Sequence, residues 1–151
     1  MSNIVNILLI AIPSVVVLLL VAVVLFKRLP RKLKADKFAS KWKELQAYCK
    51  DKTTWPQALE EADKLLDLAL RKRKYKGKTM GERMVSAQRV ISNNDAMWFA
   101  HNLHKKIAGN PKVRLSEADV KSALIGFRSA LKDIGALEPP KKPTEEEETK
   151  S

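Results

Sequence analysis

The sequence is poor in the residues from which small proteins build disulfides or catalytic sites. Cys49 is its single cysteine, which excludes an internal disulfide and suits a reducing compartment. We find no glycine-rich phosphate loop, no nucleophile elbow and no paired carboxylates in an apolar setting. The sequence therefore predicts a protein that is not an enzyme and that holds no cofactor or metal ion.

A long apolar run occupies the N-terminal part of the chain. Residues 4–26 carry no charged side chain and are long enough for a bilayer core, which needs about 20 apolar residues. No basic segment precedes the run and no small-residue cleavage motif follows it, so an uncleaved anchor is favoured over a secretory signal peptide. The sequence predicts one transmembrane helix over residues 4–26, after a short external N-terminus at residues 1–3.

Positive charge is concentrated directly after this run, in a chain whose net charge is +12. By the positive-inside rule, the protein is expected in the cytoplasmic (inner) membrane as a single-pass protein, with its N-terminus outside and its C-terminal domain in the cytoplasm. The same charges determine topology and attract anionic lipid headgroups, at about 1 kcal/mol per basic residue. The side chains expected at the membrane surface are Lys27, Arg28, Arg31, Lys32, Lys34 and Lys37.

Beyond the apolar run the sequence predicts an all-α fold, because apolar residues recur three and four apart and no segment alternates as a strand does. A basic juxtamembrane helix is expected within residues 27–52, and a bundle domain over residues 53–137. Together they form a small cytoplasmic helical bundle of about five helices. The expected helix N-caps are Thr53 or Thr54, Thr79 in a capping box with Glu82, Asn94 or Asp95, and Ser116.

The C-terminal residues 138–151 have a different composition. Three prolines and a run of glutamates at positions 145–148 leave nothing to bury in a core. The sequence predicts a disordered, Pro/Glu-rich tail. Its acids can either solubilise the protein or fold back on the basic clusters.

A second basic cluster lies in the middle of the bundle domain, where a helix is expected to end at a turn provided by Gly77. The cluster combines cations that can contact phosphates with a tyrosine that can stack on a base. A solvated helix end is the simpler interpretation, and no RNA-binding signature accompanies the cluster. The candidate polyanion contacts are Arg71, Lys72, Arg73, Lys74, Tyr75, Lys76 and Lys78.

Two histidines, His101 and His104, lie one helical turn apart and could present two nitrogens to a metal ion. No Asp, Glu or Cys follows at a further helical step on that face, and a zinc site normally needs at least a third protein ligand. Structural or surface histidines are favoured over a metal site.

Three stretches carry a resemblance to a known group of proteins. They are residues 62–67 (Ala-Asp-Lys-Leu-Leu-Asp), 75–83 (Tyr-Lys-Gly-Lys-Thr-Met-Gly-Glu-Arg) and 98–101 (Trp-Phe-Ala-His). Over roughly residues 55–137 the chain resembles an uncharacterised helical domain of small-genome, candidate-phylum bacteria, in which a membrane anchor often precedes the domain. The resemblance supports an architecture more than an activity.

That group in turn resembles, more distantly, the HEPN superfamily of helical bundles. Its active ribonucleases carry an arginine and, several positions on, a histidine. In the matching region, residues 103–110, this chain has His104 in place of the arginine and Gly109 in place of the histidine. The resemblance therefore implies a HEPN-like bundle that has lost its catalytic pair, and a homodimer, because such bundles often pair through their helices.

Together these patterns predict a non-catalytic, membrane-tethered helical adaptor that binds an unidentified protein partner at the inner face of the membrane. The alternative is a membrane-localised RNA-binding protein with a degenerate HEPN-like bundle, in which residues 71–78 contact phosphates. RNA is the less favoured partner. A third class, a divergent nuclease that uses His101 or His104 in acid–base chemistry, is the least favoured.

Overall fold

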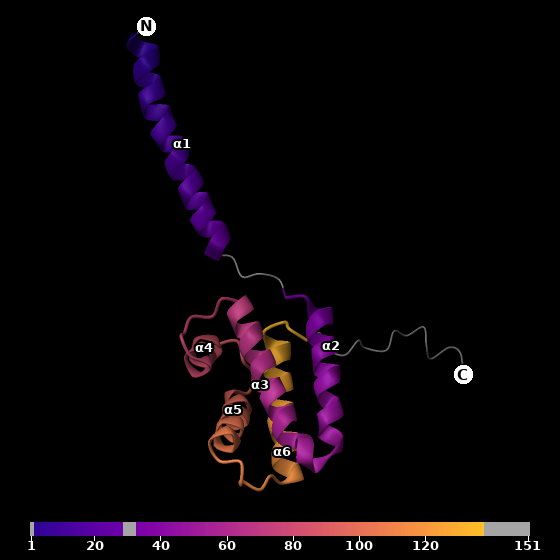
Figure 1. The fold of residues 1–151 in the computed structure, drawn as a ribbon. Helices are drawn as coiled ribbons and strands as arrows, with labels where there is room; N and C mark the ends of the chain where they lie inside the picture. The colour runs from indigo at the N-terminus through magenta and orange to yellow at the C-terminus, as the bar shows by residue number, and fades with distance from the viewer. Residues whose placement is uncertain (1, 29–32, 138–151) are drawn as a thin grey trace, which may run out of the picture. The chain divides into compact units, whose positions relative to one another are not determined.

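The computed structural model describes residues 2–28 and 33–137, and describes side chains for residues 12–25 and 33–137 (Figure 1). The chain divides into two units, residues 1–31 and residues 32–151. The described residues form helices, turns and loops without any strand. The predicted disordered tail, residues 138–151, lies outside the described residues.

The first unit contains one long helix, α1 (Ser2–Arg28). Within the part of the chain that the structure describes, no helix is long and apolar enough to cross a membrane. The predicted transmembrane helix over residues 4–26 is therefore wrong, whereas the all-α class is confirmed.

The second unit is a helical bundle, as predicted. Five α-helices and two 3₁₀ turns follow one another with short connections. They are α2 (Ala35–Gln46), η1 (Ala47–Lys50), η2 (Lys52–Thr54), α3 (Trp55–Lys72), α4 (Met80–Ala87), α5 (Asn94–Gly109) and α6 (Glu117–Asp133).

Helix α3 is the centre of this bundle, because α2, α4, α5 and α6 all pack against it (Figure 1). Its stripe of fully buried residues includes Leu59, Ala62 and Leu66. On α2 the buried side chains recur at helical spacing and form part of the same core. Residues 35–46, part of the segment predicted as a basic juxtamembrane helix, therefore form a helix that packs on the bundle.

Helices α5 and α6 pack closely against each other at Gly126. A Cβ atom added there would lie 2.4 Å from the carbonyl oxygen of Ala96, which is backbone and cannot rotate away. Glycine at this position thus permits the close packing of α6 against α5, the helix that carries the two histidines described below.

Two of the expected helix caps form as predicted. The hydroxyl of Thr79 accepts a hydrogen bond from the backbone N–H of Glu82 at 3.2 Å, and that of Ser116 accepts from Asp119 at 3.1 Å. The Glu82 carboxylate accepts from the N–H of Lys78 at 2.6 Å, one residue before the position that a capping box uses. This bond draws the preceding loop onto α4.

Two other caps differ from the prediction. The Thr54 hydroxyl does not cap α3, because it donates instead to the carbonyl oxygen of Tyr48 at 2.6 Å. Helix α5 is capped by Asn93, whose side chain accepts from the N–H of Ala96 at 2.9 Å. Asn94 is the first residue of α5, and its side-chain amide donates to carbonyl oxygens of the preceding turn.

Candidate functional site

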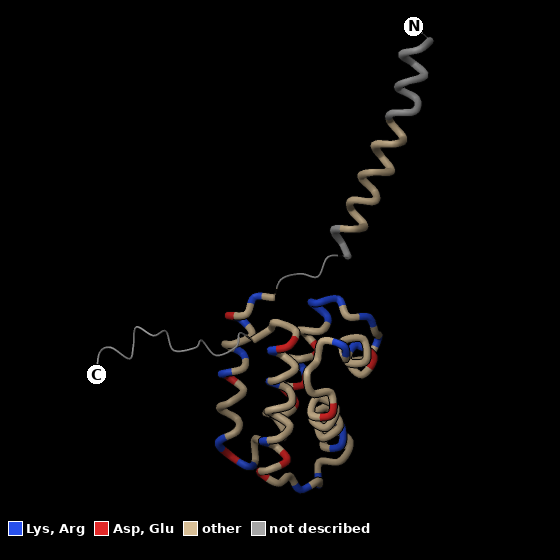
Figure 2. Tube along the Cα trace, turned by 180° about the vertical axis from the view of Figure 1, so that it is seen from behind, with Lys and Arg blue, Asp and Glu red and all other residues tan. Residues whose placement is uncertain are grey.

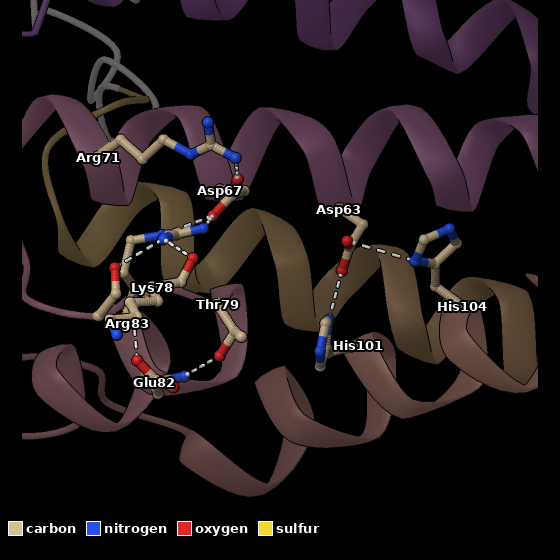
Figure 3. Close-up of polar contacts among 10 residues, drawn as sticks. Asp63, Asp67, Arg71, Lys78, Thr79, Glu82, Arg83, His101 and His104 are labelled. Carbon is tan, nitrogen blue, oxygen red and sulfur yellow. Dashed lines mark hydrogen bonds and ion pairs between the residues drawn. The ribbon is translucent and has the colours of Figure 1, made fainter.

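Two carboxylates from the central helix α3 organise the polar interior of the bundle. Asp63 and Asp67 lie one helical turn apart, and their side chains are 10% and 13% exposed. Each carboxylate accepts from basic side chains of a different helix (Figure 3). Because buried carboxylates are unfavourable without partners, these pairs help to determine how α4 and α5 dock on α3.

Asp63 pairs with both histidines of α5. Its Oδ1 lies 2.8 Å from Nδ1 of His101, within hydrogen-bond distance, and its Oδ2 lies 3.3 Å from Nδ1 of His104, an ion pair outside hydrogen-bond geometry. The ring of Trp98 contacts His101 edge-on, with 6.1 Å between ring centroids. Figure 3 shows the carboxylate between the two imidazoles. Both histidines of α5 therefore face the same carboxylate inside the bundle.

The electrostatics of this cluster follow from its burial and its charges. Burial alone would raise the pKa of Asp63, but its contacts with His101 and His104 hold that pKa below its ordinary value. The Asp63 carboxylate raises the pKa of His104, with a smaller contribution from Glu60; burial and Lys64 act in the opposite direction. The cluster therefore favours a charged pair of Asp63 and His104 at mildly acidic pH.

Asp67 pairs with Arg83, a buried residue of α4. Nε of Arg83 donates to Oδ1 of Asp67 at 2.8 Å, and its Nη1 donates to the carbonyl oxygens of Gly77 and Lys78 at 2.9 and 3.1 Å. One guanidinium thereby ties α4, α3 and the connecting loop together (Figure 3). Arg71 makes a second, exposed ion pair with the same carboxylate.

The loop between α3 and α4 is held at several points along its backbone. The N–H of Tyr75 donates to the carbonyl oxygen of Leu70 at 3.1 Å, and that of Lys76 donates to the hydroxyl of Ser86 at 3.2 Å. Gly77 has φ of +146°, and a Cβ atom there would lie 2.7 Å from the backbone nitrogen of Arg83. Only glycine fits this position, so the loop has a defined shape.

The predicted polyanion contacts fall on this loop and on the last turn of α3, where Figure 2 shows lysine and arginine gathered. Four of them, Lys72, Lys74, Lys76 and Lys78, have exposed side chains. None of the four makes an ion pair within the part of the chain that the structure describes. We call these four residues the lysine loop.

The other three predicted contacts are engaged within the bundle. Arg71 pairs with Asp67, and Nε of Arg73 donates to the carbonyl oxygen of Ile134 at 2.7 Å. Tyr75 is half-buried and packs against the hydrophobic core. The cluster thus separates into three residues with partners inside the bundle and four lysines that face solvent.

The residues predicted at a membrane surface are placed only in part. Lys34 and Lys37, at and near the start of α2, are exposed. The side chains of Lys27, Arg28, Arg31 and Lys32 lie outside the described residues.

Sequence reasoning missed Asp63, Asp67 and Arg83. Asp63 lies within the apolar stripe of α3, four residues after Leu59 and three before Leu66. An acid in such a stripe predicts a buried basic partner, and this signal could have found the site. The stretches 62–67, 75–83 and 98–101, quoted above for their resemblance, meet here through the pairs Asp63–His101 and Asp67–Arg83.

The chemistry open to this arrangement is limited by its burial. A carboxylate on Nδ1 of an imidazole is the arrangement that orients a general base. Here both imidazoles share one carboxylate, and their side chains are only 10% and 20% exposed. Among the described residues, no group of three or more His, Cys, Asp or Glu is placed to hold a metal ion.

No protein-family model, no curated protein and no solved structure matches this chain. The resemblance to candidate-phylum helical domains and to HEPN bundles therefore stays a prediction. The function has to be argued from the residues themselves.

Proposed function

We propose that this protein is a non-catalytic helical adaptor that binds an acidic surface of another protein through the lysine loop. The observation that supports the proposal is a contrast within one segment. Its backbone is fixed to α3 and α4 by hydrogen bonds, while four lysine side chains face solvent.

A loop with a fixed backbone lowers the entropy cost of binding a partner. Side chains displayed on an ordered backbone lose less conformational entropy on binding than those on a flexible segment. Residues 71–78 contain six cations and no acid, so the local potential is positive and attracts acidic surfaces during diffusional encounter. A charged surface of this kind increases the association rate and the specificity of docking.

The burial of Tyr75 favours a protein over RNA as the partner. Single-stranded nucleic acid is bound by combining phosphate contacts with stacking of bases on exposed aromatic rings. Tyr75, the one aromatic residue within 71–78, is half-buried against the core, so little of its ring face is free for a base. Lysines without a stacking platform suit carboxylates at least as well as phosphates.

Crosslinking in intact cells tests this proposal. The full chain is compared with a variant in which Lys72, Lys74, Lys76 and Lys78 are replaced by glutamate. Its matched control carries the same replacement at four other exposed lysines, Lys50, Lys105, Lys106 and Lys112. We expect the lysine-loop variant to lose a specific protein partner by at least tenfold, and the control to retain it.

Equal loss in both variants would show that only net charge matters, and the adaptor proposal would fail. Circular dichroism of both variants checks that the helices are intact. Recovery of RNA by the wild-type chain, and its loss from the lysine-loop variant alone, would favour the second candidate function below.

The second candidate is RNA binding, which is supported by the six cations and the lack of acidic residues in 71–78. It predicts that the logarithm of the affinity for single-stranded RNA falls linearly with the logarithm of the salt concentration. The slope should be about −0.7 for each phosphate that the protein contacts. A slope unchanged after the four lysine replacements would dispose of RNA binding at this loop.

The membrane location and the homodimer that the sequence predicts stay predictions. Location at the inner face of the cytoplasmic membrane, with Lys34 and Lys37 on anionic lipid headgroups, can be checked by fractionation of cells. A homodimer can be checked by analytical ultracentrifugation over a range of concentrations. Neither is needed for the adaptor proposal.

A further inference from the structure

A groove runs between α2 and α6, both of which pack on α3. It consists of two hollows, of about 380 and 330 Å³, that share Trp42, Gln46 and Arg128 in their linings. The first hollow includes Leu137 and the start of α2. The second includes Cys49 and the first turns of α6. The groove therefore leads from the end of the described chain toward the opposite end of the bundle.

The lining contains two tryptophans and an unpaired hydrogen-bond donor. Trp42 and Trp55 contribute to it, and Ile125 is an exposed apolar residue at its edge. The indole Nε1 of Trp42 is shielded from solvent and has no hydrogen-bond partner among the described residues. A shielded N–H without an acceptor is unfavourable, so an added carbonyl oxygen at this point would be stabilising.

We propose that the C-terminal tail of this same chain, residues 138–151, lies in this groove as an extended proline-rich segment instead of remaining disordered. Leu137, the last described residue, is itself part of the lining, so the tail begins at the groove. Pro139, Pro140 and Pro143 favour a polyproline II conformation, which docks on aromatic-lined grooves at a low entropy cost.

The lengths of tail and groove agree. Residues 117–131 of α6 span about 21 Å at the helical rise per residue. The seven residues 138–144 span about 22 Å in polyproline II. A tail that enters beside Leu137 thus brings Thr144 near the second hollow, which Cys49 lines.

Cys49, the single cysteine of the chain, supplies the test. A Thr144→Cys variant of the full chain is oxidised under mild conditions, and the rate of the intramolecular disulfide is followed by mass spectrometry. Burial raises the pKa of the Cys49 thiol, so all rates are compared at one alkaline pH. A disulfide requires the two Cα atoms to come within about 7 Å.

A flexible tail would also reach Cys49 by chance, so a second variant measures that background. It carries Thr144→Cys together with alanine at Pro139, Pro140 and Pro143, which keeps length and charge. We expect the proline-containing chain to crosslink at least tenfold faster. An Asn102→Cys variant, with the new cysteine exposed on α5, controls for crosslinks between molecules.

Two results would overturn the proposal. Equal rates with and without the prolines would mean that the tail is free. A disulfide that links two chains at a rate proportional to concentration would place the tail in the groove of a second copy, or outside the groove altogether.

Discussion

Two neighbouring turns of α3 each place a carboxylate inside the bundle, and the two carboxylates have different kinds of basic partner. Asp63 and Asp67 are both nearly buried and both bind basic side chains of another helix. Asp67 binds an arginine, which keeps its charge at every pH a protein tolerates. Asp63 binds two histidines, and a histidine changes its charge near neutral pH. The docking of α4 on α3 is thus expected to be independent of pH, and that of α5 to depend on it.

The two carboxylates also differ in the parts of the protein that they connect to α3. The Arg83 guanidinium connects Asp67 to two carbonyl oxygens of the loop, so this pair supports the backbone beneath the lysine loop. Asp63 contacts only α5 side chains through the interactions described here. The comparison predicts that replacing Asp67 will change both the stability of the protein and its binding through the lysine loop. Replacing Asp63 should change mainly the stability.

Replacing Arg83 by methionine should have the largest effect. It leaves Asp67 nearly buried with only the exposed partner Arg71, and it removes two hydrogen bonds to the loop. Breaking one side of a buried ion pair costs about 3–5 kcal/mol. Chemical denaturation should show a loss of unfolding free energy of this size.

The double variant Arg83→Met, Asp67→Leu provides the control. It removes both charges, so no unpaired carboxylate remains, and part of the lost stability should return. Stability equal to the sum of the two single losses would contradict the idea that these charges act as a pair.

Replacing Asp63 by asparagine should have the next largest effect. The shape is kept, but the charge that both histidines face is removed. Hydrogen bonds to charged groups contribute about 1.5–3 kcal/mol, so a loss of about 2 kcal/mol is expected at pH 6. Unchanged stability would show that the histidines are held by packing alone.

How far the sequence predicts this molecule depends on which interactions are local. The caps at Thr79 and Ser116 were predictable because a cap involves residues three apart in the chain. The exposure of the four lysines agrees with the solvated helix end that the basic run predicts, although Tyr75 within the run packs against the core. The expected transmembrane helix rested on composition alone and did not hold for the described residues.

The site itself could not be predicted in the same way, because its contacts are distant in sequence. Asp63 and His101 are separated by 38 positions. The two histidines alone show no third ligand or counter-charge, since their partner lies on another helix. Only the position of Asp63 in an apolar stripe gave a local sign of the pairing, and it does not say which residue is the partner.

The pH dependence of stability sharpens the comparison further. The pKa of His104 is raised in the folded state by Asp63, so its contribution is full below about pH 6.5, the ordinary histidine value, and is lost as the pH rises through the folded value. The pKa of Asp63 is lowered, so its contribution is present above about pH 4 and is lost in acid. Unfolding free energy should therefore fall between pH 6 and pH 8.

The groups that face His104 define the control for this experiment. Asp63 and Glu60 favour its charged form, and Lys64 opposes it. A His104→Gln variant should lose most of the decline between pH 6 and pH 8, while the Arg83→Met variant should keep it. A decline of the same size in both would locate the titrating group elsewhere.

Replacing Arg71 by alanine should have the smallest effect, although Arg71 binds the same carboxylate as Arg83. The side chain of Arg71 is 63% exposed, against 8% for Arg83, so water and salt screen its ion pair. Exposed pairs of this kind contribute about 0–1 kcal/mol. Denaturation in low and high salt should show a loss within that range that shrinks as salt is added. A loss as large as that of Arg83→Met would mean that exposure does not distinguish the two arginines, and the difference between the inner and outer partners of Asp67 would disappear.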